Sequence, residues 1–247
     1  MSDMFGKSLK GCWVVVFFAC LATSAHAQCS HRTIGTSGIG IVSNNPFLAE
    51  RVTTSVTLAA DRTKRVNTFM EYVARDSSGR VRIERLLQPL SPNATETEIA
   101  AIRRQIIICD AAAGTSIQLD SLFQTAKITE DSDPAPTNPA RHPYGSAYFP
   151  PPNAKMPPNS QFEDLGWKTI EGVEAHGGRL TTPVRVDERW SSEDLAADLL
   201  EVHSDPGKGS ETRIALTRVR RTEPDPSLFL IPKGYSVSKV AAGVNRQ

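Results

Sequence analysis

The sequence lacks an excess of charge of either sign. Its 28 basic and 27 acidic residues give a formal net charge of +1 at pH 7. Proteins that bind nucleic acids carry a surplus of lysine and arginine, because these residues neutralise the phosphates. Attraction to an anionic membrane surface depends on the same surplus. The even balance therefore predicts that neither a nucleic acid nor a charged membrane surface is what this protein recognises.

Long apolar runs are scarce as well. Apart from residues 11–22 (GCWVVVFFACLA), the sequence has no long uncharged apolar stretch. A helix needs about 18 or more apolar residues to span the ~30 Å hydrocarbon core of a membrane, and this stretch of 12 is too short. We therefore do not expect an integral membrane protein.

The first 27 residues instead have the three parts of an export signal. Lys7 and Lys10 supply the positive charge at the start, and the apolar run follows them. Ala25-His26-Ala27 then places small residues at the two positions that a signal peptidase reads. This order of features predicts a signal peptide over residues 1–27.

Cleavage is predicted between Ala27 and Gln28, which leaves a mature chain of 220 residues in the periplasm or outside the cell. That chain has 26 basic and 26 acidic residues, so its formal charge is zero. A lipidation signal at Cys20 is the alternative interpretation. The aromatic residues Phe17 and Phe18 fit the positions before such a cysteine poorly.

Cysteines are few, and only Cys29 and Cys109 remain after cleavage. Two cysteines in an oxidising compartment are candidates for one disulfide, which would tie the N-terminal tail to a central strand. Closing a loop of about 80 residues in this way would be worth roughly 4 kcal/mol. Two unpaired thiols are the alternative. A structural zinc site needs more ligands than these cysteines supply, so no metal is predicted.

A mature chain of this length fits one domain that is mainly β. We predict a flexible N-terminal tail over 28–46, a β-rich domain over 47–238 and a C-terminal tail over 239–247. Alternating β-branched residues between turn signals predict the strands. These are 52–58, 65–75, 80–86, 105–109, 116–119, 123–128, 165–175, 180–190, 195–203 and 211–220.

Local signals mark the ends of these elements. Gly79 supplies the positive φ for a hairpin turn, and His176-Gly177-Gly178 is interpreted as a turn between two strands. Thr95 and Glu98 form a capping-box pair that predicts a short helix over 95–104. Asn93-Ala94-Thr95 also matches a glycosylation sequon, and a helix cap is the interpretation we favour. Asp225-Pro226 predicts one further helical turn.

Residues 130–160 interrupt the domain with a proline-rich segment. Nine prolines fall between Pro134 and Pro158. Because proline cannot donate to a sheet ladder, an interior strand is excluded there. The composition predicts a flexible, polyproline-like loop. It is either a solvated loop without a binding role or a ligand for a partner protein, and we favour the solvated loop.

Catalytic signatures are absent from the sequence. No Gly-x-Ser-x-Gly elbow is present, and adjacent His203, Ser204 and Asp205 cannot form a triad because neighbours on a strand point to opposite faces. The sequence therefore predicts no catalytic residue, no metal ligand and no cofactor, and a protein that is not an enzyme. Trp167 and Trp190 are candidates for a ligand-binding face, with burial in the core as the alternative.

Four pieces of the last strands occur in a familiar order: Glu188-Arg189-Trp190, Val202-His203-Ser204-Asp205, Thr217-Arg218-Val219-Arg220 and the stretch from Pro224 to Pro232. This order resembles the C-terminal half of the lipoprotein-carrier superfamily, which includes LolA, LolB and RseB-like envelope proteins. A second set of pieces is Asn45-Pro46-Phe47, the stretch from Arg75 to Arg82, Leu165-Gly166 and Ile170-Glu171-Gly172. With these pieces, segments 45–90, 104–122 and 163–236 resemble a family of secreted bacterial proteins of unknown function.

The resemblance implies an incomplete (half) barrel, which is a curved antiparallel sheet with few short helices. Members of that superfamily use the concave face to bind acyl chains or peptides that report envelope stress. We therefore expect a non-catalytic protein that binds a lipid or lipidated peptide. A protein-interaction or stress-sensor module, with another envelope protein as partner and no small ligand, is the alternative.

Overall fold

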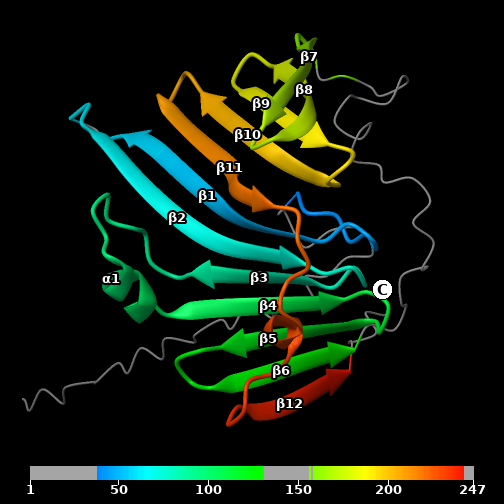
Figure 1. Cartoon of the computed structure of the whole chain (residues 1–247). Coiled ribbons are helices and arrows are strands. Elements are labelled where there is room, and N and C mark those ends of the chain that lie inside the picture. Colours follow the sequence, from blue (N-terminus) through cyan, green and yellow to red (C-terminus); the bar gives the residue numbers. More distant parts are fainter. Residues whose placement is uncertain (1–37, 60, 131–155, 157, 242–247) are drawn as a thin grey trace, which may run out of the picture.

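The strands of this chain lie side by side in one sheet (Figure 1). The structure is a computed structural model, and it describes residues 38–59, 61–130, 156 and 158–241. The predicted signal peptide, Cys29 and most of the proline-rich segment lie outside the described residues. The strands and helices are β1 (Phe47–Leu58), β2 (Lys64–Arg75), β3 (Val81–Leu86), α1 (Glu96–Ala101), β4 (Arg104–Asp110), β5 (Thr115–Asp120), β6 (Thr125–Glu130), β7 (Gln161–Ile170), β8 (Val173–Thr181), β9 (Val186–Ser192), β10 (Ala197–Asp205), β11 (Ser210–Arg220), the 3₁₀ helix η1 (Pro226–Phe229) and β12 (Ser236–Ala241).

The predicted fold class is confirmed, because the sheet is twisted and remains open. Its order is β12-β6-β5-β4-β3-β2-β1-β11-β10-β9-β8-β7, so β12 and β7 are the two edges. Every pair is antiparallel except β12 and β6. Figure 1 shows the strand direction turning from one edge of the sheet to the other. Within the described residues, no helix is long and apolar enough to cross a membrane.

Three of the local signals form as predicted. Gly79 has φ +88° in the β2–β3 turn. Thr95 and Glu98 make a reciprocal capping box, although α1 ends at Ala101 and is shorter than predicted. Asp225 caps η1 through its side chain, which accepts a hydrogen bond from the Ser227 amide. Turns and caps depend on neighbouring residues, and sequence patterns of a few residues therefore predict them well.

The interpretation of His176-Gly177-Gly178 as a turn was wrong, because these residues lie inside β8. The turns fall at Glu171-Gly172, where both residues have positive φ, and after Thr181. Gly177 lies beneath the Trp190 ring, where an added Cβ would lie 2.5 Å from Cζ3. Glycine in a strand interior often marks such a close approach, and here it was mistaken for a turn signal.

Substituting Gly177 with alanine is expected to destabilise the fold by about 1–3 kcal/mol, because the new methyl group overpacks against the indole. Urea denaturation followed by circular dichroism measures this change. Gly207→Ala is the matched control, since its Cβ would meet its nearest neighbouring atom at an ordinary 3.4 Å. Equal effects of the two substitutions would contradict the role given to Gly177.

The predicted tail over 28–46 differs from the structure in residues 38–46, which pack onto the sheet. Ile39 is fully buried and forms a β-bridge with Ala197. The Asp198 amide donates to the Gly38 carbonyl at 2.9 Å. The segment is rich in glycine and was therefore predicted to be a tail, although Ile39 within it belongs to the core. At the other end, β12 continues to Ala241, past the predicted boundary at 238.

Two apolar clusters lie on opposite faces of the sheet, because successive residues of β4 alternate between them. Ile107 and Cys109 belong to the larger cluster, which also contains Ile39. Ile106 and Ile108 belong to the smaller cluster.

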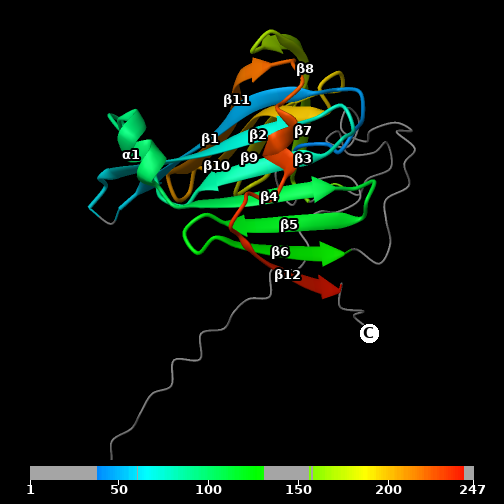
Figure 2. The ribbon, with the colours of Figure 1, turned by 60° about the horizontal axis from the view of Figure 1, so that its bottom comes forward.

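Residues 221–235, which we name the C-terminal arm, cover the smaller cluster with Phe229. The arm crosses the sheet near β3 and β4 before β12 joins the edge (Figures 1 and 2).

Candidate functional site

A groove of about 690 Å³ lies on the face of the sheet that the C-terminal arm partly covers. Strands β1 to β4 form its floor, the end of β11 forms one wall, and the arm contributes the other. Its lining residues are Leu48, Ala49, Glu50, Tyr72, Val73, Ala74, Arg82, Glu84, Arg104, Arg218, Val219, Arg220 and Leu228.

The arm is attached beside this groove by polar contacts. Arg82 Nη1 on β3 donates to the Leu228 carbonyl at 3.0 Å. Near the start of the arm, Glu223 accepts a hydrogen bond from the Ser77 amide at 3.1 Å. The Arg80 guanidinium lies 4.8 Å from the centre of the Phe229 ring. These contacts fix the position of the wall formed by Leu228.

A β-bulge in β11 brings two arginines to the groove. Glu50 on β1 pairs with Thr217, but Leu48 pairs with Arg220, so β11 has one extra residue between these positions. Alternation without the bulge would place Val219 opposite Leu48 and direct both arginines to the other face. With the bulge, both Arg218 and Arg220 line the groove.

The bulge is held in a conformation that costs free energy. Arg218 has φ +52°, in the left-handed region, which costs a residue with a Cβ roughly 1–2 kcal/mol. Its amide donates to Glu171 Oε2 from the β7–β8 turn at 2.8 Å. A strained residue that neighbouring groups hold in place is typical of binding sites.

The lining carries more positive than negative charge. Its four arginines outnumber its two glutamates, Glu50 and Glu84. Glu84 pairs with both Arg82 and Arg104, and Glu50 pairs with Arg218 Nη1 at 2.9 Å. Arg220 is exposed and makes no ion pair with another described residue.

Tyr72 lies among these charges on the groove floor. Burial, together with the carboxylate of Glu50, raises the pKa of the Tyr72 phenol. The phenol therefore stays protonated at neutral pH and can donate a hydrogen bond. The groove thus offers donors and positive charge beside the apolar side chains of Leu48, Ala74 and Leu228.

Neither tryptophan proposed from the sequence lines this groove. Trp190 is 6% exposed and belongs to the larger apolar cluster, and its Nε1 donates to Glu188 Oε1 at 2.7 Å. Trp167 is 58% exposed on the edge strand β7 and stacks on His176 with ring centres 4.6 Å apart. The sequence placed both on strands but could not show which face of the sheet would be hollow.

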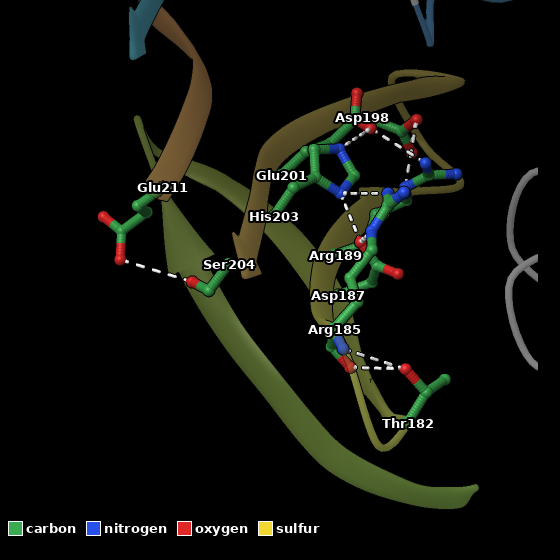
Figure 3. A network of polar contacts seen from close by, with 9 residues as sticks. All are labelled: Thr182, Arg185, Asp187, Arg189, Asp198, Glu201, His203, Ser204 and Glu211. Atoms are coloured by element: carbon green, nitrogen blue, oxygen red, sulfur yellow. Dashed lines mark hydrogen bonds and ion pairs between the residues drawn. The ribbon is translucent and has the colours of Figure 1, made fainter. Parts of the chain in front are cut away.

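A second polar cluster connects β9 and β10 (Figure 3). His203 contacts Asp187 Oδ1 through Nδ1 at 2.6 Å and Glu201 Oε2 through Nε2 at 3.5 Å. Both contacts raise the pKa of His203, and the contact with Glu201 has the larger effect. Ser204 turns away and donates to Glu211 at 3.4 Å, as expected for neighbours on a strand.

Asp198 occupies the buried end of this cluster. Ser191 Oγ donates to its Oδ1 at 2.5 Å, and Oδ2 accepts no hydrogen bond from the described part of the chain. Burial raises the pKa of Asp198 to about 7. The described residues contain no group of three or more potential ligands arranged to hold a metal ion. We interpret this cluster as a pH-sensitive part of the core.

Comparisons with known proteins concern the fold. No family model and no curated protein matches the sequence. Among solved structures, the chain aligns with an uncharacterised conserved protein from Thermus thermophilus at TM-score 0.42 and 12% identity, over 79% of this chain and 91% of that one.

Two further solved structures align with the chain, and one of them is named as a LolA superfamily protein. The MucA/MucB complex of Pseudomonas aeruginosa aligns at TM-score 0.40 and 15% identity, over 80% of this chain and 59% of that one. A LolA superfamily protein from Nitrosomonas europaea aligns at TM-score 0.29 and 10% identity, over 77% and 92%. With TM-scores below 0.5, these similarities assign no ligand to this chain.

Proposed function

We propose that this protein is an exported, non-catalytic binding module that holds an acyl chain, free or attached to a peptide, in the groove beside the C-terminal arm. The observation that carries the proposal is the groove itself, about 690 Å³ in volume. Sites for small ligands commonly measure about 300–1,000 Å³. The bulge that directs two side chains into the groove supports a binding role.

The chemistry of the lining supports binding rather than catalysis. Both glutamates are paired with arginines, and the raised pKa of Tyr72 keeps its phenol protonated. A general base must accept a proton and a nucleophile must offer a free lone pair, so the two carboxylates are the lining groups that could serve as either. Each carboxylate is instead held in an ion pair with arginine, and the other described lining residues are Tyr72, arginines and aliphatic residues.

Native mass spectrometry of the protein purified from the periplasm tests this function. We expect a mass excess over the mature chain, and solvent extraction should release it as a lipid. Leu48→Trp fills the groove opposite Arg220 and is expected to abolish the excess. Val184→Trp is the control, because Val184 is 70% exposed in a distant turn. A mass without ligand in the unmodified protein would contradict the proposal.

The same measurement tests export and the disulfide. Cleavage after Ala27 gives a chain that begins at Gln28, and a Cys29–Cys109 disulfide makes it lighter by two hydrogens. Cys109 is fully buried in β4, where a disulfide would be shielded from reductants. A lipidated chain that begins at Cys20 would show a larger mass.

A protein-interaction module is the second candidate function, and the edge strand β7 favours it. No other described strand pairs with the outer side of β7, and an unpaired edge can accept a strand from another protein. The exposed Trp167 lies on this edge. If the mass spectrum shows no ligand, another envelope protein that adds a strand to β7 becomes the better proposal.

A further inference from the structure

We infer that the groove selects single-chain amphiphiles with an anionic head group, and that Arg218 and Arg220 bind this head. The inference rests on the proposed function and adds the chemical class of the ligand. A carboxylate or a phosphate would satisfy it, because both accept hydrogen bonds from guanidinium groups in the same geometry.

The distribution of charge is the first observation that supports an anionic head group. Basic and acidic residues are nearly equal in the whole sequence, but the groove lining has four arginines and two glutamates. Pairing therefore leaves a local surplus of positive charge. Arg220 holds part of that surplus, because it makes no ion pair with a described residue.

The bulge in β11 is the second observation, because it places two arginines where they can bind such a head group. It brings Arg218 and Arg220 to the groove wall, although alternation from Thr217 alone would direct both to the opposite face. The conformation of Arg218 is unfavourable, and Glu171 stabilises it through the amide hydrogen bond. The bulge thus brings two arginines to the same wall of the groove, and we infer that an anionic head group contacts both.

The volume of the groove is the third observation, and it supports a ligand with a single chain. A chain of about 16 carbons occupies roughly 500 Å³, if each carbon takes about the 30 Å³ of a water molecule in the liquid. The volume of one chain with its head group therefore matches that of the groove, about 690 Å³, whereas two such chains, at about 1,000 Å³, exceed it. Leu48, Ala74 and Leu228 supply the apolar contacts that such a chain needs.

Isothermal titration calorimetry with the delipidated mature protein tests the inference. The probes are dodecanoate, its uncharged methyl ester, and acetate, each below its aggregation concentration. We expect dodecanoate to bind at least about tenfold more tightly than the ester, with an affinity that falls as salt is added. Acetate alone should not bind measurably.

Arg220→Gln should weaken dodecanoate binding about tenfold and leave binding of the ester unchanged. Arg218→Gln is a second variant with the same expected pattern. Arg213→Gln is the matched control, since Arg213 is exposed on the same strand and does not line the groove. A variant that simply unfolds would lose binding of both chains, which separates that result from a lost head-group contact.

Equal binding of dodecanoate and its ester, without effect of either variant, would overturn the inference and leave the proposed function intact. If neither dodecanoate nor its methyl ester binds, both the inference and the proposed function are wrong. Acetate that binds as tightly as dodecanoate would identify a site for small free anions, and this result would also overturn the inference.

Discussion

Replacement of Arg75 by methionine is expected to destabilise the fold by at least about 3 kcal/mol. Arg75 is fully buried at the end of β2. Its guanidinium donates to the carbonyls of Asn45 at 2.8 Å, Gly40 at 2.8 Å and Leu195 at 2.6 Å. Each buried carbonyl that loses its donor costs roughly 1–3 kcal/mol. The substitution removes three donors at once.

These carbonyls belong to two segments that are far apart in the sequence: Gly40 and Asn45 precede β1, and Leu195 lies between β9 and β10. Arg75 therefore fastens residues 38–46 and the β9–β10 turn to β2. Burial lowers the pKa of Arg75 to about 9, so the side chain remains protonated at neutral pH and keeps all its donors. Phe47 packs against the guanidinium, 4.7 Å from the ring centre.

Urea denaturation at pH 7 measures the effect of Arg75→Met. The exposed Arg213 on β11 is the control, and Arg213→Met is expected to change stability by less than about 0.5 kcal/mol. If both substitutions had equally small effects, Arg75 would not fasten these segments to the sheet.

The sequence predicted those features that depend on neighbouring residues. The β2–β3 hairpin is an example, because Asp76 Oδ1 accepts a hydrogen bond from the Arg80 amide four residues later, and Gly79 supplies the positive φ. The capping box of α1 is another. Alternating residues likewise identified most of the strands, although the Gly177 region was misread.

Features that depend on distant residues could not be read from the sequence. Strand β1 pairs with β11 more than 150 residues later, and β12 joins β6 in parallel. The burial of Arg75 was also missed, since arginine is almost never fully buried unless partners satisfy it. Its three partners lie in segments without a recognisable pattern.

The candidate site was missed for the same reason. Thr217-Arg218-Val219-Arg220 was recognised as the end of a strand, and alternation predicts that its two arginines share one face with each other but not with Thr217. The bulge breaks this alternation, and Glu171 in the β7–β8 turn stabilises it by accepting a hydrogen bond from the Arg218 amide. Nothing local to β11 signals this contact.

The stability of the fold is expected to increase as the pH falls from 8 to 5, because of Asp198. Burial raises its folded-state pKa from the usual 3.8 to about 7. Between these values the folded protein holds a proton that the unfolded chain releases, so lower pH favours folding. His203 acts in the same direction, since its raised pKa gives stability that is present below about pH 6.5 and lost as the pH rises through its folded-state value.

Substitution of Asp198 by asparagine isolates this contribution. Asparagine can still accept the hydrogen bond from Ser191 and carries no charge into the core. The variant is expected to be more stable than the unmodified protein by up to about 4 kcal/mol at pH 8, and roughly 3 kcal/mol of that advantage should disappear at pH 5. Urea denaturation at pH 5, 6, 7 and 8 gives the difference directly.

Asp205→Asn is the matched control for this series. Asp205 lies in the β10–β11 turn region, and its contacts with Lys208 lower its pKa, so its carboxylate stays ionised from pH 5 to 8. Its substitution should therefore shift stability by the same amount at every pH. The pKa of Glu201 is also lowered, which places its titration below this window. If the curves of Asp198→Asn and the unmodified protein ran parallel, Asp198 would be ionised in the folded state throughout. The ion pair with Arg189, whose Nε lies 3.9 Å from Asp198 Oδ2, would then outweigh the effect of burial.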